Sequence, residues 1–252
     1  MVAVVVVVGA AGVWFLTRAA APEPTLTTTD IPALQVRAAQ VRPGSAVPVN
    51  LTAVDKPTTM SLAGWAGDVS GVTGIPVPAL RAYGNAELAT RAADPGCHLT
   101  WATLAGIGRV ESDHGRFGGA HLVANGEESR PVIGVPLDGN GVRAVADTDG
   151  GYYDGDPVHD RAVGPMQFLP GTWRAFGADA MGTGRPDPEN VNDAALAAAH
   201  YLCTGGRDLG TPSGWWAGLL SYNNSATYGQ KVFGLADTYA HQAYDALRGA
   251  DH

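Results

Sequence analysis

The stretch with the clearest chemical signature runs from residue 101 to residue 112. At the period of a helix, Trp101, Leu104, Gly108 and Glu111 share one face. The first two are large and apolar, and the glycine leaves room for another backbone to approach. A carboxyl held against apolar neighbours keeps its proton, because desolvation disfavours the charged form. Glu111 is therefore a candidate general acid, and the alternative is an ordinary glutamate that faces water at a helix end.

Two further stretches carry side chains suited to holding a sugar. One reads Gly-Pro-Met-Gln-Phe over residues 164–168, and the other reads Ser-Tyr-Asn-Asn over residues 221–224. Amide side chains offer a sugar both hydrogen-bond donors and acceptors, and a tyrosine ring can cover an apolar sugar face. For Met166 and Tyr222 the alternative is ordinary packing in the core.

Glu111-Ser112 and these two stretches, in this order within a mainly helical domain, resemble the lytic murein transglycosylases, in particular their B-type branch. Those enzymes belong to the lysozyme-like superfamily, and the resemblance covers roughly residues 75–247. It implies that Glu111 is the single catalytic acid/base. It implies substrate-binding roles for the remaining motif residues, which are Ser112, Met166, Gln167, Phe168, Tyr222, Asn223 and Asn224.

The resemblance also implies where these residues lie and what reaction they perform. Met166 and Gln167 would line the groove that holds the glycan, and Tyr222 and Asn223 would face Glu111. The acid would protonate the bond between N-acetylmuramic acid and N-acetylglucosamine, and would then take the proton of the muramic C6 hydroxyl as that oxygen attacks C1. The product is a 1,6-anhydro sugar, formed without water. The alternatives are a hydrolytic muramidase of the same fold and a non-catalytic glycan-binding module.

Glycoside hydrolysis normally uses two carboxyl groups, and no motif marks a second one here. Asp113 lies two residues beyond Glu111 and points away from it on a helix. An Asp/Gly-rich loop at residues 147–160 could supply a second acid, although its composition is equally typical of turns. Its aspartates are Asp147, Asp149, Asp154, Asp156 and Asp160.

One departure from the B-type pattern concerns calcium. Members of that branch often carry an EF-hand-like loop after the Met-Gln motif, and the corresponding stretch here begins at residues 179–184. Met181 offers no oxygen ligand, and Asn190 stands where an EF-hand places its bidentate glutamate. Asp187 and Glu189 are nearby acids that could compensate. We expect poor or absent calcium binding, a Gly-rich surface turn, and neither a metal nor a cofactor.

The elements that position these residues are expected to be mainly helical. The predicted helices cover residues 78–92, 101–112 (with Thr100 as the N-cap), 166–176 (with a break at Pro170), 193–203, 214–222 and 226–247. Extended pieces at 121–124, 132–135 and 142–145, separated by turns at 125–126 and 138–141, predict a small antiparallel β element. The predicted fold class is α+β, mainly helical, with a lysozyme-like domain.

The chain of 252 residues divides into three parts. An apolar run within residues 1–18 predicts a signal-type or membrane-anchor segment, with a buried strand as the alternative. Residues 19–74 are rich in Pro, Thr and Ala, which is typical of a tether. The lysozyme-like transglycosylase domain is expected over residues 75–248. This organisation predicts an extracytoplasmic protein, either anchored in the cell membrane or secreted to the cell wall.

The charge and the cysteines narrow the range of partners. A net charge of -8 without a basic cluster argues against nucleic acid as a ligand. The expected partners are peptidoglycan glycan strands and, through the N-terminal segment, the membrane. Cys97 and Cys203 are the only two cysteines, and export favours oxidation, so we predict that they form a disulfide. The absence of C-x-x-C and H-E-x-x-H motifs argues against a zinc or redox site.

Overall fold

The structure, a computed structural model, describes residues 35–51 and 61–249. The predicted signal or anchor segment, residues 1–18, lies outside these ranges. Within them no helix is both long enough and apolar enough to cross a membrane. The helices are α1 (Leu62–Thr73), α2 (Val77–Ala93), α3 (Trp101–Ser112), the 3₁₀ helix η2 (Phe117–Gly119), α4 (Pro170–Phe176), α5 (Val191–Cys203), α6 (Pro212–Tyr222) and α7 (Ala226–Gly249).

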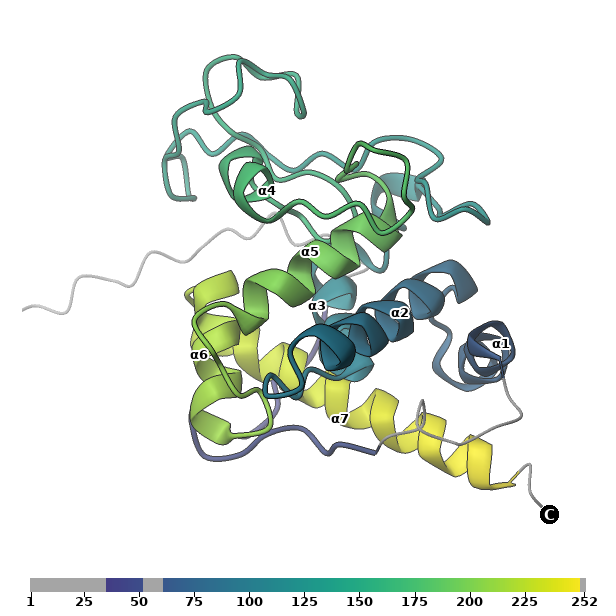
Figure 1. Ribbon diagram of the computed structural model, residues 1–252. Coiled ribbons are helices and arrows are strands. Elements are labelled where there is room, and N and C mark those ends of the chain that lie inside the picture. The colour runs from purple at the N-terminus through teal and green to yellow at the C-terminus, as the bar shows by residue number, and fades with distance from the viewer. Residues whose placement is uncertain (1–34, 52–60, 250–252) are drawn as a thin grey trace, which may run out of the picture.

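Helix α3 occupies the centre of a helical body, behind α2 and α5 in Figure 1, and packs closely against α7. Every residue from Trp101 to Gly108 is buried, so the helix is enclosed on all sides rather than along the one predicted face. A Cβ at Gly106 would lie only 2.8 Å from the Val232 carbonyl oxygen, which explains how α7 comes so near. Gly108 makes room for the Tyr83 hydroxyl, not for a backbone as predicted.

The two ends of α3 are set by local chemistry. The Thr100 side chain accepts a hydrogen bond from the Thr103 backbone N–H, which confirms the predicted N-cap. At the other end, Asp113 adopts a left-handed conformation with φ 54°, so the helix stops at Ser112. Glu111 therefore lies in the last turn of the helix.

The N-terminal part of the described chain belongs to the body, so the prediction of a tether up to residue 74 is wrong. Helix α1 buries Trp65, whose ring meets that of Trp101 edge to face at 5.2 Å. Upstream, residues 35–51 run along the body, where the Ala46 carbonyl accepts a 3.0 Å hydrogen bond from the Trp216 indole. The packed domain therefore starts well before residue 75, because these apolar side chains find partners on α2, α6 and α7.

A loop-rich lobe over residues 113–190 lies above α5 in Figure 1 and contains only η2 and α4 as helices. The predicted antiparallel β element is wrong, because this part of the described chain has isolated bridges and no strands. One bridge, Leu122 with Glu128, does flank the predicted turn at 125–126. The predicted pieces pair only at single points, such as Ile133 with Val163, so no ladder extends between them.

Most of the remaining helices have nearly the bounds that the sequence predicts. Helices α5, α6 and α7 confirm the three predicted C-terminal helices to within two residues at each end. In contrast, Pro170 begins α4 instead of breaking a helix that starts at residue 166, since a proline suits the first turn. The predicted disulfide is present, with the Cα atoms of Cys97 and Cys203 5.5 Å apart. It ties the segment before α3 to the last turn of α5.

Candidate functional site

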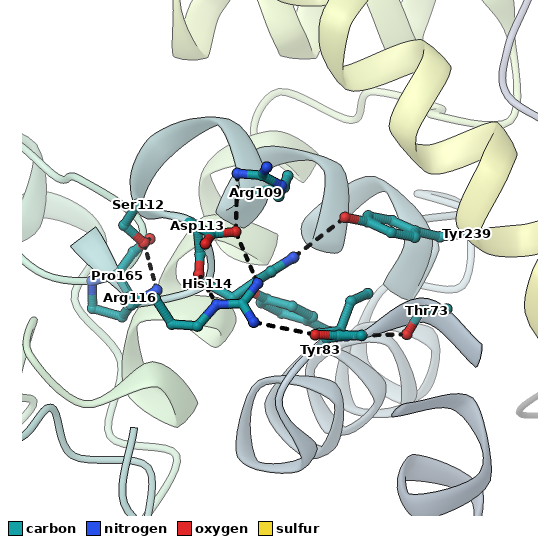
Figure 2. Close-up of polar contacts among 12 residues, drawn as sticks. Thr73, Tyr83, Arg109, Ser112, Asp113, His114, Arg116, Pro165 and Tyr239 are labelled. Atoms are coloured by element: carbon teal, nitrogen blue, oxygen red, sulfur yellow. Dashed lines mark hydrogen bonds and ion pairs between the residues drawn. The ribbon is translucent and has the colours of Figure 1, made fainter. Parts of the chain in front are cut away.

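The three motifs meet at the C-terminal end of α3. The Ser112 hydroxyl donates a 2.6 Å hydrogen bond to the Pro165 carbonyl, a contact visible in Figure 2, and accepts one from the Gly115 N–H at 2.7 Å. The Tyr222 hydroxyl donates to the Met166 carbonyl at 2.8 Å. Both neighbouring motifs thus hold the backbone of the Gly-Pro-Met-Gln-Phe loop, and segments more than fifty residues apart in the chain are brought together.

The motif loop itself is a tight turn. Val163 and Phe168 exchange two backbone hydrogen bonds of 2.9 and 3.0 Å across it. Gln167 takes the left-handed conformation with φ 50°, which is uncommon outside glycine. Gly164 also has a positive φ, and a Cβ there would collide with the Pro188 carbonyl. The loop therefore has one well-defined shape, fixed from both sides.

Glu111 is partly exposed, while its carboxyl lies in an apolar setting. Burial raises the pKa of Glu111 from 4.5 to about 7, and a 2.6 Å hydrogen bond from the Tyr228 hydroxyl acts in the opposite direction. A carboxyl with this pKa can both give and take a proton near neutral pH. Sequence reasoning missed Tyr228, because a tyrosine in the first turn of an amphipathic helix is indistinguishable from a core residue.

The other motif residues lie around this carboxyl in different ways. Burial and, after it, the charge of Glu111 raise the pKa of Tyr222, so this tyrosine lies near the acid. Asn223 and Asn224 follow at the end of α6 with exposed side chains. Phe168 is almost fully buried.

Met166 does not line a groove, contrary to the prediction. Its side chain is fully buried, beside Gly108 of α3, because an unbranched thioether fills the space that the glycine leaves. Gln167 is partly exposed, and its side-chain amide donates to the carbonyls of Val132 (3.0 Å) and Gly164 (2.9 Å). The side chain of this glutamine is thus oriented by the loop that carries it.

Glu111 is the one acid in this arrangement. No other carboxyl of the described chain contributes to the shift in its pKa. Asp113 points elsewhere and pairs with Arg109 at 2.9 Å and Arg116 at 2.8 Å, as Figure 2 shows. The aspartates of the 147–160 loop accept hydrogen bonds from nearby backbone N–H groups, which favours turn chemistry over a catalytic role for them.

A comparison with known families now agrees with this geometry. Residues 161–219 match the model of the family described as "Transglycosylase SLT domain". The match supports a peptidoglycan-acting transglycosylase domain of the lysozyme-like superfamily. It contains the motif loop and helices α4 and α5, but stops short of Tyr222 and begins after Glu111. Searches of curated proteins and of solved structures found no significant match.

Next to the three motifs, a buried chain of polar side chains supports the end of α3. His114 lies between two tyrosines, with Nδ1 3.1 Å from the Tyr83 hydroxyl and Nε2 3.4 Å from the Tyr239 hydroxyl (Figure 2). Burial lowers the pKa of His114 well below its usual value, so the imidazole is neutral at neutral pH. These contacts anchor the turn that follows Glu111.

The loop where the B-type branch often binds calcium does not suit the ion. Both carboxylate oxygens of Asp179 accept backbone N–H groups of its own loop, from Thr183 and Gly184. Met181 is exposed, and its thioether is a poor calcium ligand. Glu189, which could have compensated, accepts the Val132 N–H instead. The residues present therefore do not form an EF-hand-like site.

Proposed function

We propose that this chain is a lytic transglycosylase of the B-type pattern. It cleaves the bond between N-acetylmuramic acid and N-acetylglucosamine in peptidoglycan and leaves 1,6-anhydro-N-acetylmuramic acid ends. The observation that carries the proposal is the isolation of Glu111, a carboxyl with a pKa of about 7 and no carboxyl partner among the described residues. A reaction that uses the substrate's own hydroxyl needs one group that acts first as acid and then as base.

The surrounding residues have definite tasks in this reaction. The Tyr228 hydroxyl orients the Glu111 carboxyl through its 2.6 Å hydrogen bond. Gln167, which is partly exposed beside the acid-bearing turn, and the exposed amides of Asn223 and Asn224 bind the polar groups of the sugar. The buried residues Ser112, Met166 and Phe168 hold the loop in place instead of contacting the glycan.

The two alternative functions fit the geometry less well. A hydrolytic muramidase normally needs a second carboxyl to activate water or to attack the sugar, and the site offers none beside Glu111. A non-catalytic glycan-binding module has no use for a desolvated acid, because burying a carboxyl costs free energy that binding alone does not recover. The three functions also differ in what they release from peptidoglycan: 1,6-anhydro ends, reducing ends or nothing.

We also propose that the protein works outside the cytoplasm, either anchored through residues 1–18 or secreted. Its substrate lies there, and the disulfide between Cys97 and Cys203 suits an oxidising compartment. Fractionation of cells and N-terminal sequencing of the mature chain test this part. A mature chain that starts near Pro22 would indicate secretion, and a protein confined to the cytosol would exclude both possibilities.

The products of the reaction test the proposed function. Purified peptidoglycan is incubated with the wild-type chain or with Glu111→Gln, and the released muropeptides are analysed by mass spectrometry. We expect 1,6-anhydro ends from the wild type and almost none from the variant. New reducing ends would identify a hydrolase, and bound glycan without any release would identify a binding module.

A further inference from the structure

Glu128 and Glu189 are two partly exposed residues behind the motif loop, and most of their carboxyl oxygens are buried. Each carboxyl contributes to the shift in the pKa of the other, so the two groups lie close together. Three of the four oxygens (both of Glu128 and Oε1 of Glu189) are buried and receive no N–H or alcohol O–H from the rest of the described chain. Burial, together with Glu189, raises the pKa of Glu128 to about 10, and the neighbouring Asp187 adds to the shift. A proton held between the two carboxyls would satisfy these oxygens.

One side of the pair supports the motif loop. Glu189 Oε2 accepts the Val132 N–H at 2.9 Å. The carbonyl of the same residue, Val132, accepts the Gly164 N–H at 2.9 Å and the Gln167 amide at 3.0 Å. A single residue thus separates the carboxyl pair from the glutamine that we assign to glycan binding.

The other side of the pair touches the turn after Glu111. A Cβ at Gly115 would lie 2.8 Å from Glu128 Oε1, so the carboxyl packs directly against this glycine. The Gly115 N–H binds the Ser112 hydroxyl, which in turn donates to the Pro165 carbonyl. The two carboxyl groups therefore lie where the acid-bearing turn and the motif loop come together.

We propose that Glu128 and Glu189 are positioning residues that lock the Gln167 loop against the turn that carries Glu111. The inference rests on the proposed function for its catalytic meaning, although the locking itself is a property of the structure. Removing Glu128 leaves Glu189 as a lone carboxylate in a dry setting, which draws it towards water and weakens its hold on Val132. A glutamine at 128 supplies an N–H donor in place of the proton, so it should preserve the lock.

Three variants test the lock: Glu128→Ala, Glu128→Gln and Glu127→Ala. Glu127 is the exposed neighbour of the pair and makes the matched control. The loop is read by NMR, through the side-chain amide of Gln167 and the methyl group of Met166, so this measurement needs no activity. In parallel, KM and kcat are measured on soluble glycan strands at a temperature where every variant is folded.

We expect Glu128→Ala to shift both NMR signals and to lower kcat/KM roughly 10- to 100-fold, mostly through KM, because the binding loop is displaced. Glu128→Gln and Glu127→Ala should keep the wild-type signals and stay within about twofold of the wild-type kcat/KM, since neither removes a donor from the pair. Unchanged signals in Glu128→Ala, or equal losses in Glu128→Gln, would overturn the inference. Shifted signals with an inactive wild type would leave the lock standing and contradict the proposed function alone.

A further test uses the wild-type protein, so its result does not depend on whether a variant folds. In a carboxyl-carbon NMR titration, one member of the pair should remain protonated at pH 8, where exposed glutamates are fully ionised. If both carboxyls instead titrate near 4.5, the pair shares no proton and the proposed lock does not exist.

Discussion

The helical body and the loop-rich lobe hold their parts of the site by different physical means. In the body, α3 is enclosed by apolar side chains from Trp101 to Gly108, and its backbone is satisfied within the helix. In the lobe, backbone N–H groups bind aspartate side chains, and bridges such as that between Val163 and Phe168 replace strands. The body therefore depends on buried apolar area, and the lobe on individual hydrogen bonds.

Because body and lobe are held differently, the pKa of Glu111 and the position of Gln167 depend on different contacts. Burial is the largest cause of the rise in the pKa of Glu111, and its hydrogen-bond partner Tyr228 belongs to α7 of the body. The position of Gln167 is set by the lobe, through polar contacts with Val132 and Gly164. We therefore expect changes in the body to alter global stability, and changes in the lobe to alter substrate binding with smaller effects on stability.

The largest effect on the body should come from removing the disulfide. The bridge closes a loop with a sequence separation of 106 residues. In the chain-entropy model, replacing Cys97 and Cys203 with alanine should lower the free energy of unfolding by about 4–5 kcal/mol. Denaturant titration of the double variant measures this loss. A change below about 1 kcal/mol would mean that the bridge does little for the body.

Glu111→Gln should have the largest effect on activity and an opposite effect on stability. Loss of the transferable proton should lower kcat roughly 10²–10⁴-fold. The pKa of folded Glu111, about 7, lies above its ordinary 4.5, so ionisation opposes folding and the wild type loses stability as the pH rises between these values. Melting curves of both proteins should coincide near pH 4, and the variant should melt higher at pH 8. Equal melting temperatures at pH 8 would contradict the burial of the acid.

Asp154→Ala tests the lobe. The carboxylate of Asp154 accepts the N–H groups of Asp156 (2.9 Å) and Arg161 (2.6 Å). Its loss should lower the free energy of local opening of this loop by about 1–3 kcal/mol. Hydrogen exchange should quicken in the lobe but stay unchanged in α3. Asp138→Ala, in an exposed turn of the same lobe, is the control. Faster exchange throughout α3 would show that lobe and body unfold together.

Of these changes, Tyr228→Phe should have the smallest effect on activity and stability. The Tyr228 hydroxyl lowers the pKa of Glu111, so without it the pKa rises further. Because the protonated acid starts the reaction, the alkaline limb of the kcat/KM profile should move to higher pH, while global stability changes little. A limb that moves to lower pH would show that the hydroxyl stabilises the protonated form instead.

The sequence predicted the body better than the lobe, and for a physical reason. The central and C-terminal helices repeat apolar residues at the helical period, and two cysteines allow a single pairing. Helix α1 carried the same signal, with Leu62, Trp65 and Val69 on one face, but surrounding glycines and prolines made the stretch look like a tether. In the lobe, extended-looking pieces suggested strands, because sequence alone does not show that these pieces meet their neighbours only at isolated bridges.

Some residues of the candidate site could be predicted from the sequence, and others could not. Glu111, Ser112 and Tyr222 were found by their motifs, and the structure brings them together. Nothing in the sequence distinguishes Tyr228 from a core tyrosine. Similarly, Glu128 and Glu189 lie 61 positions apart in polar segments, where acids are usually solvated, so only the folded chain shows that they form a pair whose carboxyl oxygens are mostly buried.

A carboxyl-carbon NMR titration of Glu111, with Glu111→Gln to assign its signal, measures the property on which the proposed chemistry depends. The burial of this carboxyl predicts a pKa of about 7. A pKa near the ordinary value of 4.5 would mean that the carboxyl is ionised at neutral pH and cannot act as the single acid that begins the reaction.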